Sequence, residues 1–172
     1  MTTLIVTDAA RLLIFPDVMA FAASSDLFTM TISNRISLIL AAGFLALALA
    51  IGMPSGEILE HAGAGALVLT VTFVFFMCGW VGGGDAKLAA ATALWLGWAH
   101  LLDYLLYASL LGGALTLALL EFRKFAMPSL LAGKEWAERL HTPNGGVPYG
   151  IALAIAALVI YPSTIWMQSL GQ

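Results

Sequence analysis

Apolar residues run along this chain in six long segments, which short polar or glycine-rich stretches separate. The segments cover about residues 5–24, 36–53, 64–81, 86–102, 104–121 and 148–167. Each comes close to the roughly 17–25 apolar residues that a helix needs to cross a bilayer. The pattern therefore predicts an all-α polytopic membrane protein, a bundle of about six transmembrane helices forming a single domain over residues 1–172.

The interruptions in this pattern refine the prediction. Pro16 and Asp17 interrupt the first segment. Because no basic residues precede it, we interpret it as a spanning helix and not as a cleaved signal peptide. The fourth and fifth segments are so close that we expect a tight turn between them near Asp103.

One long polar stretch, residues 122–147, stands apart from the apolar segments. It ends in Pro143-Asn144-Gly145-Gly146, a turn signal. Its middle, from Pro128 to Leu140, is expected to form a short interfacial helix.

The composition supports a membrane protein. The chain has 172 residues, 61% hydrophobic and 10% charged, with a mean hydropathy of +0.96, whereas a soluble domain carries about 25% charged residues. The sequence contains no stripe of basic residues that would indicate nucleic acid binding. A single cysteine, Cys78, excludes an internal disulfide and is expected to be a small core residue. The histidines His61, His100 and His141 are too scattered for metal-ligand spacing, so we expect structural or surface roles and no metal site.

The basic residues predict an orientation, because Lys and Arg favour cytoplasmic loops. The loops after the first, third and fifth segments carry Arg35, Lys87 and four basic residues within 122–147, whereas the loop at 54–63 carries none. This alternation places the first, third and fifth loops in the cytoplasm and both termini outside. Among the tryptophans, Trp95 and Trp98 are expected in the outer aromatic belt and Trp80 in the inner one.

Two acids follow apolar segments on the predicted cytoplasmic side. Asp85 stands in Gly82-Gly83-Gly84-Asp85-Ala86-Lys87-Leu88, and Asp26 stands in Ser24-Ser25-Asp26-Leu27. Carboxylates at membrane depth are costly and usually functional. Glycines beside Asp85 would allow another backbone to approach closely. The topology brings both acids to one level of the membrane.

Two carboxyl groups a few ångströms apart in a low-dielectric site share one proton. One can then act as a general base on water, while the other donates to a carbonyl oxygen. Simpler roles also exist: Asp85 could cap the N-terminus of the fourth helix, and Asp26 could be a solvated loop acid. Asp17 lies about 180° from Asp26 on an ideal helix, so we expect it to face elsewhere. Lys87 is interpreted as an interfacial anchor or a phosphate-facing charge, or as a group that tunes Asp85.

These residues resemble the type IV prepilin peptidases, whose motif G-x-G-D-x-K-L matches Gly82 to Leu88, with Gly82, Gly84, Asp85 and Lys87 at its defining positions. Ser25-Asp26-Leu27 followed by Ile32-Ser33-Asn34 resembles the first aspartate motif, with Ser33 where the family usually has proline. Val147-Pro148-Tyr149-Gly150 resembles the start of the last helix of the family.

The resemblance implies an intramembrane aspartic endopeptidase with Asp26 and Asp85 as catalytic residues and no metal or organic cofactor. Its implied substrate is a prepilin with a short basic leader, cleaved at the cytoplasmic face of the inner membrane for pilus assembly. Larger members carry a region with paired C-x-x-C motifs that is associated with N-methylation. Because this sequence lacks those motifs, it resembles the short CpaA-like branch of Flp and tight-adherence systems, with partners in the pilus assembly machinery.

Two other functions remain open at this point. Paired intramembrane acids also occur in small proton-coupled transporters. A non-catalytic subunit of a secretion or pilus machine could use the same helices without needing either acid.

Overall fold

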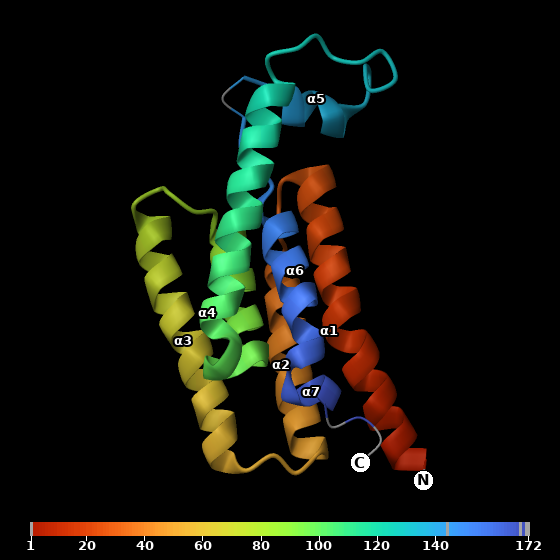
Figure 1. The fold of residues 1–172 in the computed structure, drawn as a ribbon, viewed down its shortest axis with the longest axis vertical. Helices are drawn as coiled ribbons and strands as arrows, with labels where there is room; N and C mark the ends of the chain where they lie inside the picture. Colours follow the sequence, from red (N-terminus) through yellow and green to blue (C-terminus); the bar gives the residue numbers. More distant parts are fainter. Residues whose placement is uncertain (1, 144, 169, 171–172) are drawn as a thin grey trace.

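The structure is a computed structural model that describes residues 2–143, 145–168 and 170. These residues form helices and no strand. The helices are α1 (Thr2–Thr29), α2 (Asn34–Ala50), α3 (Ser55–Met77), α4 (Gly83–Phe122), α5 (Glu135–His141), α6 (Tyr149–Ile160), the short 3₁₀ helix η1 (Tyr161–Ser163) and α7 (Ile165–Gln168) (Figure 1).

The predicted class of helical membrane protein is confirmed. Three helical stretches are long and apolar enough to cross a membrane, namely Val6–Thr29, Ser55–Met77 and Gly83–Phe122. Asn34–Ala50 and Tyr149–Ser163 are shorter apolar helices. Large apolar side chains such as Leu38 and Leu102 are 68% and 79% exposed, as expected for helices whose outer faces meet lipid.

Helix α4 is broken at Gly97, where φ is 66° and ψ is −175°. Asp85 and Ala108 line the same cavity, although a straight helix would separate them by about 35 Å. The chain therefore reverses at Gly97, and α4 consists of two antiparallel halves (Figure 1). The position predicted for the turn, near Asp103, is wrong, because Asp103 lies within the helix and is exposed. The chain turns at Gly97 instead, since only glycine readily adopts this backbone conformation.

Two side chains satisfy carbonyl groups next to this break. A helix end leaves its last carbonyl oxygens without partners, which is costly in a membrane. The Nδ1 atom of His61 on α3 lies 2.8 Å from the Leu94 carbonyl oxygen. Because a carbonyl oxygen only accepts, Nδ1 must carry the proton and donate it. The indole of Trp166 on α7 donates to the Trp95 oxygen at 2.8 Å. The structural role expected for His61 is thus a bond that supports the break in α4.

Three further expectations are corrected. Helix α3 begins at Ser55 and not near residue 64, because Pro54 precedes it in an extended conformation and Glu57 lies in its first turn, where an acid complements the helix dipole. Cys78 follows the last turn of α3 and is exposed, so it is not a core residue. Trp95 is fully buried and donates to the Leu40 oxygen, so it does not belong to an interfacial belt.

The polar stretch is less helical than predicted. Only Glu135–His141 forms a helix, α5, and Gly133 has a positive φ of 80° in the turn before it. In the predicted turn at 143–146, Asn144 lies outside the described residues. The segment predicted at 148–167 is divided into α6, η1 and α7, because Pro162 lies within η1.

The packing gathers several chain segments at one end of the bundle. Helix α3 packs along α4, and α6 packs against both α4 and α1. Figure 1 shows α5 and the connections α1–α2 and α3–α4 at one end, with both chain termini at the other. The end of α1, the start of α4 and the start of α6 therefore meet near α5.

Candidate functional site

Asp26 lies near the end of α1, on its buried face. That face is formed by residues three or four apart along the helix: Arg11, Phe15, Met19, Ala22 and Asp26. Asp26 is only 5% exposed, so it is not a solvated loop acid. Asp17 is exposed on the opposite side, which confirms the prediction that it does not share the face of Asp26.

Polar contacts fix the end of α1 that carries Asp26. The helix ends at Thr29, and Met30 directly after it has a positive φ of 54°. The hydroxyl of Ser25 donates to the Thr31 oxygen at 2.9 Å. From α5, Arg139 donates to the Phe28 oxygen at 3.0 Å, a favourable place for a cation because the carbonyl end of a helix is negative.

Asp85 lies in the first turn of α4. The residue that caps this helix is Gly82, with extended backbone angles (φ −68°, ψ 142°), so the expectation that Asp85 could be the N-cap is wrong. The position still suits an anion, because the first turn of a helix carries a partial positive charge. The Asp85 Oδ1 atom is buried and has no hydrogen-bond partner among the described residues. The hydrogen-bonding capacity of this oxygen is therefore unused by the described residues.

The glycines before Asp85 serve close packing. None of them adopts a positive φ. A side chain on Gly84 would place its Cβ 3.0 Å from Ile32 Cβ and 3.1 Å from the Ile32 oxygen, and backbone atoms cannot move aside easily. The three atoms nearest to a Cβ on Gly83 all belong to the ring of Phe76, the closest at 3.2 Å. Gly84 therefore lets the segment of Asp85 lie directly against the segment that follows Asp26.

Sequence reasoning did not identify Gly150 as a site residue. Its backbone N–H donates to Asp26 Oδ2 at 2.7 Å. A Cβ at this position would lie 2.8 Å from the same oxygen and 2.6 Å from Ile32 Cδ1. The only sequence signal was Pro148-Tyr149-Gly150 at the start of the last apolar segment, which indicates a helix start but not a contact with a distant acid.

Asp26 and Asp85 line one cavity of about 930 Å³. Its walls come from α1, α3, both halves of α4, α6 and the segment around α5. The two carboxyl groups are close enough for their charges to interact. The polar side chains of Thr72, Ser109 and Tyr149 also line the cavity, and Arg139 is a cation on its wall. Such a pair can share a proton, and the cavity has the size of typical ligand sites.

Lys87 points away from this cavity. It lies two residues after Asp85, about 200° around an ideal helix, and its Nζ donates to Asn34 Oδ1 at 2.8 Å. This geometry favours the anchoring role over the tuning of Asp85. Ser33, which stands where the family usually has proline, is the N-cap of α2 and accepts from the Arg35 N–H at 3.3 Å.

A family model described as the type IV leader peptidase family matches residues 13–117, more than half of the chain. The matched range contains Asp26, Asp85 and Lys87, whereas Gly150 and α5 lie beyond it. No curated protein and no solved structure matches the chain. Within the described ranges, no three His, Cys, Asp or Glu side chains gather as possible metal ligands.

Proposed function

Because the chain belongs to the type IV leader peptidase family, we propose that it is an aspartic endopeptidase with Asp26 and Asp85 as its catalytic pair. The family makes it a peptidase of the prepilin peptidase kind. The observation that supports the aspartic mechanism is that both carboxyl groups line one cavity: Asp26 accepts from the Gly150 N–H, and Asp85 has an oxygen that no described residue bonds.

In this mechanism the carboxyl pair holds one proton between its two members. The ionised carboxylate takes a proton from a water molecule, and the water oxygen attacks the scissile carbonyl carbon. The protonated carboxyl group donates to the carbonyl oxygen and stabilises the tetrahedral intermediate. As the intermediate collapses and its C–N bond breaks, the carboxyl group that took the water proton passes a proton to the leaving amine. Because the two groups act as a unit, their apparent pKa values belong to the pair and not to either residue.

Charge supports a cytoplasmic position for this cavity. Of the seven lysine and arginine residues, all except Arg11 lie near the start of α2, near the start of α4 or between α4 and α6. Figure 1 places these segments at the end of the bundle that carries α5. By the positive-inside rule this end faces the cytoplasm, in the inner membrane of a bacterium.

We propose that the substrate is a prepilin with a short basic leader followed by a hydrophobic helix. Flp-type pilins are the first substrates to test. Its helix would remain in the bilayer while the leader junction enters the cavity from the cytoplasmic side. Because the sequence has one cysteine and no C-x-x-C motif, we propose that this chain removes the leader without methylating the new N-terminus.

Cleavage of a synthetic prepilin by the purified protein in detergent tests this proposal. Mass spectrometry of the product reads leader removal and methylation separately, with a methyl donor present. We expect a single cut at the leader junction and an unmethylated product. A proton-coupled transporter or a non-catalytic assembly subunit would leave every prepilin intact, and that result would contradict the proposal.

A further inference from the structure

A second cavity, of about 510 Å³, lies between α2, α3 and the first half of α4. Half of its twelve lining residues are alanine or glycine on the three helices, namely Ala41, Ala62, Gly65, Ala66, Ala90 and Ala91. Asp85 and Ala89 line the catalytic cavity, whereas Lys87, Ala91 and Leu94 line this one. The first half of α4 therefore separates the two cavities.

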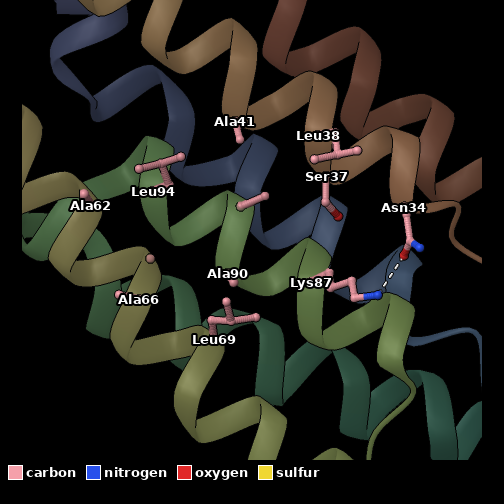
Figure 2. A pocket seen from close by; sticks show the side chains of 12 residues that line it. Asn34, Ser37, Leu38, Ala41, Ala62, Ala66, Leu69, Lys87, Ala90 and Leu94 are labelled. Carbon is pink, nitrogen blue, oxygen red and sulfur yellow. Dashed lines mark hydrogen bonds between the residues drawn. The ribbon is translucent and has the colours of Figure 1, made fainter.

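This second cavity is an open groove, with one polar end and one apolar end. Figure 2 shows Asn34, Ser37 and Lys87 at one end and Ala62 and Leu94 at the other. The ammonium of Lys87 is bonded to Asn34 at 2.8 Å, and no ion pair with an acid is found for it in the described part of the chain. Ser37 Oγ is buried without a hydrogen-bond partner among the described residues.

We propose that this groove binds a phospholipid of the surrounding bilayer with an anionic headgroup. One acyl chain lies along the alanines, and the phosphate accepts a hydrogen bond from Lys87 and, after rotation of its side chain, from Ser37. The polar end of the groove lies at the start of α4, at the same end of the bundle as Asp85, where a headgroup would be. Charge complementarity selects the headgroup, because a lysine near the membrane surface attracts anionic lipid.

The shape of the groove favours an acyl chain over a transmembrane helix. From Lys87 to Leu94 it runs for about 10 Å. A transmembrane helix is about 10 Å across with its side chains. A hydrocarbon chain is thinner and fills the space beside small side chains, where unfilled volume would cost van der Waals contacts. The flanking Leu38 and Leu69 are 68% and 45% exposed, so the groove opens outward toward lipid.

Native mass spectrometry of the detergent-solubilised protein tests this proposal. The probe is an equimolar mixture of phosphatidylglycerol and phosphatidylcholine with identical acyl chains. We expect one retained lipid and a preference for phosphatidylglycerol. Lys87→Gln should lower that preference about fivefold, the effect of one basic residue near an anionic surface. Lys124→Gln is the matched control, because Lys124 pairs with Glu121 at 2.7 Å and lies far along the chain from the groove.

Filling the groove tests the acyl chain separately. Ala41→Leu combined with Ala66→Leu should lower the occupancy of both lipids by roughly tenfold, because the chain loses its contacts along the wall. Both alanines are exposed, so the larger side chains should not disturb the fold; Ala114→Leu on the second half of α4 is the control. A photoreactive residue at position 62 should crosslink to lipid, which provides a readout that does not depend on a stable variant.

Three results would overturn the proposal. The filled variant could retain as much lipid as the wild type, or Lys87→Gln and Lys124→Gln could lower the preference equally. Position 62 could also crosslink to the hydrophobic helix of a prepilin and not to lipid, which would make the groove a helix-binding surface. None of these results bears on whether Asp26 and Asp85 cleave a substrate.

Discussion

The backbone of Ile32 occupies the space that a side chain on Gly84 would need, with its oxygen 3.1 Å from the position of a Cβ. Ile32 follows Asp26 closely in the chain, and Gly84 directly precedes Asp85. Their contact therefore sets how the two acid-bearing segments lie relative to each other. The Ile32 side chain also reaches Gly150, whose N–H holds Asp26.

Replacing Gly84 by alanine should strongly lower prepilin cleavage. The added methyl group must push the Ile32 backbone away by a few tenths of an ångström. A displacement of about 1 Å at a catalytic group can cost roughly a hundredfold in rate, so this smaller shift should cost part of that factor. Gly83→Ala is the matched control, since the nearest neighbours of its methyl group are atoms of the movable Phe76 ring. Initial cleavage rates of both variants in the same membranes give the comparison. Equal activity of the two variants would show that the contact with Ile32 is unimportant.

Gly150→Ala should impair cleavage by crowding both Asp26 and Ile32. Its Cβ would lie 2.6 Å from Ile32 Cδ1 and 2.8 Å from Asp26 Oδ2. Because Ile32→Val removes the Cδ1 atom, the double variant should recover part of the lost activity, while Ile32→Val alone stays close to the wild type. The four rates form a double-mutant cycle. Strictly additive losses would count against this packing arrangement.

Gly97→Ala should destabilise the fold by about 1–3 kcal/mol, the usual cost of a strained backbone conformation at a residue other than glycine. A Cβ there would also lie 2.8 Å from the His61 ring. The measurement is the unfolding midpoint in mixed micelles. Gly113→Ala is the control, because nothing lies within 4 Å of its Cβ position and it lies within a regular part of α4. A midpoint for Gly97→Ala equal to that of the control would mean that α4 does not reverse at this residue.

How much of the structure the sequence predicts depends on how far apart in the chain the interacting residues lie. Continuous apolar runs predicted the helical membrane fold, and helical spacing correctly separated Asp17 from Asp26. The reversal of α4 was predicted near Asp103, six residues after Gly97 where it occurs, because a polar residue in an apolar run is a clearer signal than a glycine whose positive φ only the structure reveals. The bond from Gly150 to Asp26 was missed because it joins residues 124 positions apart, a contact that packing alone determines.

Cysteine labelling of intact cells tests the proposed orientation. In a Cys78→Ser background, Lys134→Cys should react with a membrane-impermeant maleimide only after permeabilisation. Gly56→Cys, at the opposite end of the bundle in the first turn of α3, should react in intact cells. The expectation follows from the six basic residues near the end that carries α5. Labelling of both positions from the same side would overturn the membrane arrangement and the cytoplasmic position of the site.

The most direct test of the aspartic mechanism is prepilin cleavage by Asp26→Asn, Asp85→Asn and the double variant. Asparagine keeps the shape of the side chain but cannot exchange a proton. Each single variant should therefore lose at least about a thousandfold in rate, and the double variant should lose little more, because members of a catalytic unit are strongly non-additive. Asp17→Asn, on the exposed face of α1, should cleave normally at the same protein level. Near-normal cleavage by either single variant would contradict the mechanism.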